Sequence, residues 1–87
     1  MISGKTKSGF EFSVDETKLN NMEFLDVLSE TEENVLAFSK VVTMMFDPQQ
    51  KKALYDHVRL EDGTVPIEAI VEEVTEVMSA NADLKNS

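Results

Sequence analysis

One segment in the second half of the chain carries a complete set of helix start and stop signals. Asp47 can cap the first backbone N–H groups of a helix, and Pro48 follows where a missing N–H costs nothing. Gly63 then favours a helix end, and Pro66 favours the start of a further helix. The sequence therefore predicts one helix from Pro48 to about Leu60 and another that begins at Pro66.

The start of the chain shows the two-residue alternation of a β-strand. Phe10, Phe12 and Val14 alternate with polar residues, as in a strand with one buried face. Gly9 and the polar residues before it favour a turn, and Ile2–Thr6 is the predicted partner strand. Because a lone hairpin is marginal in water, we expect its apolar face to lie on the helices or on another chain.

Helical spacing of apolar residues predicts two more helices between the hairpin and the capped segment. The first begins at Asn20 or Asn21 and ends near Ser29, and the second is Val35–Phe46, with Asn34 as its cap. The second helix is apolar over so much of its surface that it must be central to a core or covered by a partner. Its apolar stripe consists of Val35, Phe38, Val41, Val42 and Met45, widened by Leu36, Met44 and Phe46.

The last predicted helix separates its apolar and acidic residues onto different faces. We expect its apolar stripe to pack against the rest of the chain, because its β-branched residues lower the intrinsic helix propensity. We expect its glutamates to form a solvated negative strip. The predicted stripe is Ile67, Ile70, Val71, Val74, Val77 and Met78, and the strip is Glu68, Glu72, Glu73 and Glu76.

The length of 87 residues predicts a single domain with a modest core. We predict an α+β fold that is mainly α: a β-hairpin in residues 1–14, about four short helices in residues 15–80, and a disordered tail in residues 81–87. No apolar run approaches the ~20 residues of a membrane span, so we predict no membrane partner. The lack of cysteine excludes disulfides and thiolate chemistry, and it fits a cytoplasmic protein.

The charge balance limits the partners. Seventeen acidic residues against eight basic ones give a formal net charge of −9, which argues against a nucleic-acid partner. The negative strip of the last helix has three interpretations: a solvated face, a docking surface for basic segments, or a mimic of the DNA phosphates. Lys51, Lys52 and Arg59 interrupt the acidic pattern, so DNA mimicry is the minor alternative.

His57 is the single histidine and therefore the residue to test for acid–base catalysis. A catalytic histidine needs a nucleophile or a substrate pocket within hydrogen-bond reach. Asp56 is adjacent in sequence, but neighbouring side chains on a helix point apart, so Asp56 cannot easily orient the ring. We expect His57 at the edge of the core, donating a hydrogen bond to a backbone carbonyl.

The run Glu61–Val65 is similar to the second half of the loop in a calcium-binding helix–loop–helix motif. Placing its glycine at the sixth loop position puts Val58, Leu60 and Ala69 where carboxylate ligands belong. A zinc or iron site would need more than one histidine in a chain without cysteine. We therefore predict no metal, no cofactor, no catalytic residue and no enzymatic activity.

The order of segments is similar to that of a known family. Lys7–Glu16 is followed by a short acidic amphipathic helix, Asn21–Leu28, and then by an apolar helix that contains Lys40–Val42. The segments Gln49–Arg59 and Glu61–Pro66 come next. This succession, over nearly the whole chain, resembles the phage tail assembly chaperone family, small proteins encoded in the tail gene clusters of siphophages and of prophages of Gram-positive bacteria.

The resemblance implies a non-catalytic protein that binds the long tape measure protein, keeps its hydrophobic helices soluble and helps tail tube subunits polymerise around it. It also implies a location in the host cytoplasm and absence from the mature virion. Many such proteins have a second, longer form made by a programmed frameshift. Two alternatives stay open: a structural phage protein, such as a head–tail connector or another virion component, and an acidic inhibitor that mimics DNA.

Apolarity alone indicates where a partner would bind. Methionine adapts to varied partners, so Met44, Met45 and Phe46 are the best candidates for an exposed apolar patch. Core filling is the preferred interpretation for Met45 and for Met22. The predicted partner-binding residues are Leu36, Val41, Met44, Met45 and Phe46, with Phe10 and Phe12 as positions for self-association.

Overall fold

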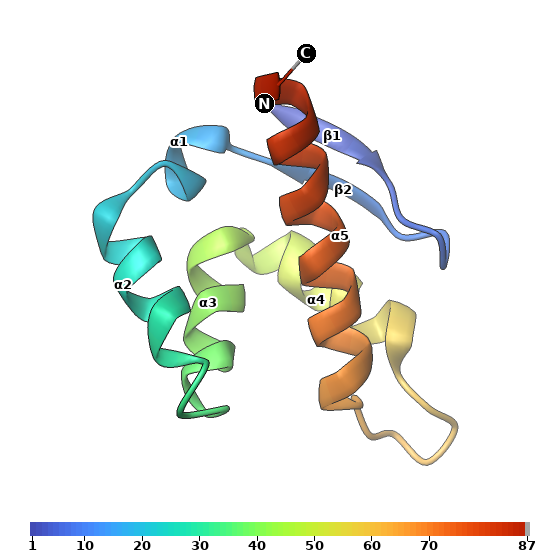
Figure 1. Cartoon of the computed structure of the whole chain (residues 1–87). Coiled ribbons are helices and arrows are strands. Elements are labelled where there is room, and N and C mark those ends of the chain that lie inside the picture. The colour runs from blue at the N-terminus through green and yellow to red at the C-terminus, as the bar shows by residue number, and fades with distance from the viewer. Residues whose placement is uncertain (87) are drawn as a thin grey trace.

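The computed structural model describes the backbone of residues 1–86 and the side chains of residues 1–80. An antiparallel hairpin is followed by a one-turn helix and four longer helices within this range (Figure 1). The predicted fold class, α+β and mainly α, is confirmed. The elements are β1 (Ile2–Lys5), β2 (Glu11–Val14), α1 (Glu16–Leu19), α2 (Met22–Glu30), α3 (Ala37–Met45), α4 (Pro48–Val58) and α5 (Ile67–Asn86).

The hairpin forms where the alternation predicted it. Ile2 lies opposite Val14 and Gly4 opposite Phe12, so the apolar residues of both strands share one face. The turn closes through the Gly9 N–H, which donates to the Thr6 carbonyl oxygen at 3.0 Å. Gly9 has a φ of +97°, which favours glycine at this turn. The apolar face is buried within this single chain, against the helices.

Two predicted helix starts are confirmed by their caps. The Asp47 carboxylate accepts the backbone N–H of Gln50 at 2.8 Å and begins α4. The Asn21 side chain accepts the Glu23 N–H at 3.1 Å and begins α2. Each cap satisfies a backbone donor that the helix itself cannot pair. The end of α4 differs from the prediction, since this helix ends at Val58 and not at about Leu60.

The start of α3 differs from the prediction. Asn34 accepts the backbone N–H of Leu36 at 3.1 Å, but the α-helix begins only at Ala37. Between them the chain makes a tighter turn, in which the N–H of Ala37 donates to the Asn34 carbonyl oxygen and that of Phe38 to the Val35 carbonyl oxygen. Val35, the first residue of the predicted apolar stripe, does not join the core, because this turn leaves it 57% exposed.

The hydrophobic core lies around α3 and is built by both strands and by every helix except α1. Val41 and Val42 of α3 are almost fully buried, which confirms that this helix is central to the core. Met45 is buried as well, whereas the predicted burial of Met22 is wrong, because that side chain is exposed. The buried cluster consists of Ile2, Phe10, Phe12, Val14, Phe24, Val27, Val41, Val42, Met45, Phe46, Leu54, Ile70, Val74 and Val77.

Helix α5 runs along the length of the molecule, past the hairpin and α4 (Figure 1). Its backbone continues to Asn86, into the segment 81–87 for which a disordered tail was predicted. The side chains of that segment, and Ser87 altogether, lie outside the described residues, so the disordered tail stays a prediction. No helix in the described part of the chain is both long enough and apolar enough to span a membrane.

Candidate functional site

An apolar groove opens between the starts of α3 and α5 and the middle of α4. It has a volume of about 170 Å³, and among its lining residues only Ser39 and Tyr55 carry polar side-chain groups. The turn before α3 and the loop before α5 lie at the same end of the molecule, away from the start of the chain (Figure 1). The lining residues are Val35, Leu36, Phe38, Ser39, Val42, Tyr55, Val65, Ile67 and Ile70.

Three large apolar side chains on this groove are open to solvent. Val35 is 57% exposed, Leu36 79% and Ile67 61%. Apolar side chains that gather at one exposed site favour an interaction surface, whereas scattered ones need no explanation. This group, Val35, Leu36 and Ile67, is called the groove rim below.

The groove rim follows from how the helices begin. The tight turn before α3 exposes Val35 and Leu36 ahead of the first buried residue, Ala37. Ile67 is the first residue of α5, one turn before the buried Ile70. Both helices therefore start with apolar residues where no other element of the described chain covers them.

Leu36 is the one predicted partner-binding residue on this groove, and Met44 is half-buried away from it. The other five are buried: Val41, Met45 and Phe46 in the core, and Phe10 and Phe12 beneath the hairpin. The exposed patch is therefore wrong for Phe46, while Met45 fills the core, as its preferred interpretation predicted. The physical reason is the hairpin, whose Phe10 ring packs edge-on against Phe46 with 6.3 Å between ring centroids.

Eight of the nine groove residues were not predicted to bind a partner, among them Val35, Tyr55, Val65 and Ile67. Val35 and Ile67 were assigned to buried stripes because their spacing matches the core residues of their helices. A signal for exposure was present. Val35 and Ile67 each come directly after a polar turn or loop, where the preceding helical turn that would cover a side chain is missing. Tyr55 lies off the apolar axis of its helix, which indicates a place at the surface, whereas Val65 carried no signal, because it lies in the loop between α4 and α5.

A second feature is a buried carboxylate, that of Glu73 on α5. Glu73 is only 4% exposed, so the predicted solvated strip is wrong at this position, although Glu68 and Glu72 are exposed. The missed signal is its place on the helix, three residues after Ile70 and four before Val77, which puts it on the buried face.

Glu73 belongs to a hydrogen-bonded cluster centred on Ser8 in the hairpin turn. The Ser8 hydroxyl donates to Glu73 Oε1, lies 2.9 Å from His57 Nε2 and lies 3.1 Å from Thr6 Oγ1. Because a serine hydroxyl has one proton, and Ser8 donates it to Glu73, the histidine and threonine act as donors to Ser8. The second oxygen, Glu73 Oε2, is buried and has no hydrogen-bond partner among the described residues.

The cluster contains a serine, a histidine and an acid, but not in the order of a hydrolase triad. In a triad the histidine stands between the nucleophile and the acid, and takes the serine proton. Here the Ser8 hydroxyl stands between the imidazole and the carboxylate. The arrangement ties the hairpin turn to α4 and α5. It also corrects the predicted partner of His57, which is a hydroxyl and not a backbone carbonyl.

The loop between α4 and α5 is stabilised by Asp62. The hydrogen bonds from the Thr64 hydroxyl and from the Thr64 backbone N–H hold the pKa of the Asp62 carboxyl below its ordinary value. This loop supplies Val65 to the groove. Within residues 1–80, no three histidine, aspartate or glutamate side chains gather as a metal site would require.

Comparisons of the chain with protein-family models, with curated proteins and with solved structures found no match. The resemblance to phage tail assembly chaperones therefore stays an expectation.

Proposed function

We propose that this protein is a non-catalytic phage tail assembly chaperone that binds an apolar segment of the tape measure protein. The observation that supports the proposal is the groove rim, where Val35, Leu36 and Ile67 stand exposed around an apolar depression. A groove of this kind suits an amphipathic helix that lays its apolar face into it. In this proposal the protein acts in the host cytoplasm, assists assembly of the tail tube and is absent from the mature virion.

The size of the groove fits one large anchoring side chain. A cavity of about 150 Å³ can hold a benzene molecule, and the groove measures about 170 Å³. One phenylalanine or leucine of the partner would therefore fill it, with neighbouring apolar residues covering the rim.

The expected affinity is weak. Covering a partly exposed apolar side chain contributes about 1–2 kcal/mol, so the three rim residues contribute about 3–6 kcal/mol. The partner's single anchor adds about 1.5–3 kcal/mol, while association costs about 4–15 kcal/mol in lost translational and rotational freedom. The balance favours reversible binding, which suits a protein that must release its client when the tail tube forms.

Co-expression with the tape measure protein of the same tail gene cluster tests the proposal. We expect the tape measure protein to become soluble and to co-purify with the chain. Leu36→Ser should abolish both effects, because Leu36 is exposed and its loss removes apolar contact area without disturbing the core. The matched control is Leu25→Ser, on the exposed face of α2 and outside the groove. No complex with the unaltered chain, or equal loss in both variants, would contradict the proposal.

The two alternatives make different predictions. A head–tail connector or other virion component would be found by mass spectrometry of purified particles, where a chaperone should be missing. A DNA mimic would capture basic DNA-binding proteins with an affinity that falls steeply as salt rises. The burial of Glu73 weakens this second alternative, because it interrupts the negative strip of α5.

A further inference from the structure

Acidic residues predominate in the two segments that carry the groove rim. The two segments that carry the groove rim, residues 30–39 and 60–68, contain six acidic residues and no basic one. All six are exposed. They are Glu30, Glu32, Glu33, Glu61, Asp62 and Glu68, called the acidic flanks below.

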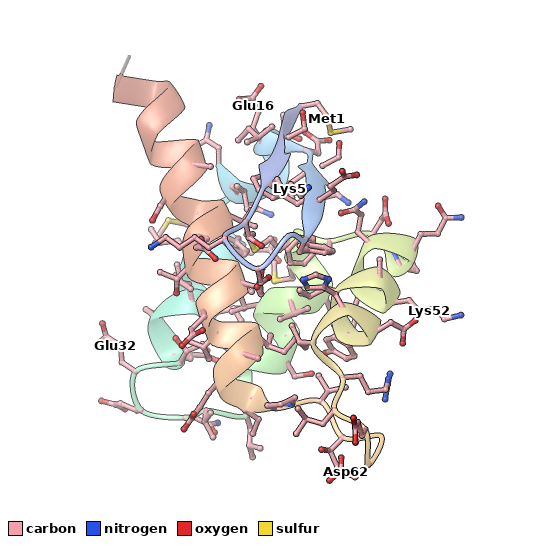
Figure 2. All side chains as sticks on the ribbon, turned by 90° about the vertical axis from the view of Figure 1, so that its right-hand side faces the viewer. Met1, Lys5, Glu16, Glu32, Lys52 and Asp62 are labelled. Carbon is pink, nitrogen blue, oxygen red and sulfur yellow. The ribbon has the colours of Figure 1, made fainter. Side chains whose placement is uncertain are left out.

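The acidic flanks stand on both sides of the groove end of the molecule. Figure 2 shows Glu32, from the turn before α3, and Asp62, from the loop before α5, at this same end. Lys5 of the hairpin lies toward the other end in the same view. A partner in the groove would therefore meet negative charge on each side of its apolar anchor.

Two bases near the groove, Arg59 and Lys51, are already engaged, whereas Lys40, directly after the lining residue Ser39, is exposed. Arg59 forms an ion pair with Asp56 at 3.2 Å and donates to the Gly63 carbonyl oxygen at 2.8 Å. Lys51 lies over the Tyr55 ring, 5.6 Å from its centroid, and donates to the Thr43 hydroxyl. Because Arg59 is held by Asp56 and the Gly63 carbonyl oxygen, it forms no ion pair with the acidic flanks among the described residues.

We infer that the groove selects a helix whose apolar anchor is flanked by lysine or arginine residues. The inference rests on the proposed function and names the chemistry of the partner. Opposite charges around an apolar anchor speed association and reject wrong partners, because charges within about 8 Å still interact at physiological salt. A second copy of this chain does not fit, because it would bring its own six acidic residues against these six.

Two synthetic helical peptides of about 15 residues test the inference. Both carry the same leucines at positions i, i+3, i+4 and i+7, and the remaining positions are lysine in one peptide and glutamate in the other. Fluorescence anisotropy with the whole chain measures both affinities at low and at high salt. We expect the lysine peptide to bind about tenfold more tightly at low salt, and this preference to shrink at high salt.

Charge variants locate the effect. Glu32→Gln with Glu33→Gln should reduce the preference for the lysine peptide several-fold. The matched control is Glu11→Gln with Glu16→Gln, which changes the net charge equally in the hairpin and α1 and should leave the preference intact. Leu36→Ser should weaken both peptides alike, because it removes the apolar contact that they share.

The outcomes separate the inference from the proposed function. Equal binding of the two peptides at low salt overturns the inference and leaves the groove function standing. Binding of neither peptide, together with no complex with the tape measure protein, overturns both. A dimer of the chain that Leu36→Ser abolishes in analytical ultracentrifugation would assign the groove to a second copy and overturn the inference.

Discussion

Replacing Ser8 with alanine tests whether a buried carboxylate holds the hairpin turn on the helices. Ser8 donates to Glu73 Oε1, and Glu73 Oε2 has no hydrogen-bond partner among the described residues. Ser8→Ala removes the one donor that the structure gives this carboxylate. A polar group that is 4% exposed and has lost its partner cannot turn to water without moving the hairpin turn or α5.

The size of the effect follows from the environment of Glu73. A hydrogen bond to a charged group contributes about 1.5–3 kcal/mol, and a buried group left without its partner costs about as much. Ser8 itself is exposed, so water can replace part of the lost bond. We expect Ser8→Ala to lower the free energy of unfolding by about 2 kcal/mol. In a Glu73→Met background the same change should cost only about 0.5 kcal/mol, because no carboxylate then needs a donor.

Urea unfolding at pH 7, followed by circular dichroism, measures both values. With a denaturant slope of about 1 kcal/mol per molar urea, a loss of 2 kcal/mol moves the midpoint by about 2 M. Ser13→Ala is the matched control, since Ser13 lies in the same hairpin and its hydroxyl makes none of the described hydrogen bonds. The reasoning is refuted if Ser8→Ala unfolds like Ser13→Ala, or if its cost is the same with methionine at position 73.

Leu54→Ala should lower the free energy of unfolding by about 2–5 kcal/mol, because Leu54 is fully buried, while Leu60→Ala at a 53% exposed position should change it by less than about 0.5 kcal/mol in the same thermal unfolding assay. Gly63→Ala should cost about 1 kcal/mol in urea unfolding through its φ of +91° alone, since an added methyl group meets nothing within 4 Å; an unchanged midpoint would contradict this. Because the folded pKa of Asp62 lies below its unfolded value, its stabilising effect is present above about pH 3.9 and is lost as the pH falls through the folded pKa. Unfolding curves between pH 5 and pH 2 should therefore show the unaltered chain losing more stability than Asp62→Asn, and parallel losses would contradict the assignment.

Signals contained within a few residues were predicted correctly. Asp47 and Asn21 cap the helices that they were expected to cap, because a cap needs only a backbone N–H two or three positions away. The alternation of Phe10, Phe12 and Val14 predicted a strand for the same reason, since successive side chains of a strand point to opposite faces.

The candidate site was predicted less well, because it depends on contacts between elements. Leu36 was proposed to contact a partner and lies on the groove rim, whereas Met45 and Phe46, proposed for the same contact, are buried. Their exposure depended on whether the hairpin would cover the end of α3. The contact between Phe10 and Phe46, 36 positions apart in the chain, decides that question.

Local patterns in the sequence were enough to assign residues to a helix or strand face and to locate most helix starts. Which parts of those faces are covered depends on the packing of the elements, which departs from the pattern at the exposed Val35 and at the buried Glu73. Periodicity is a property of one element and fixes the direction of each side chain. Burial of a side chain needs a second element packed over it, so it depends on how far that second element extends.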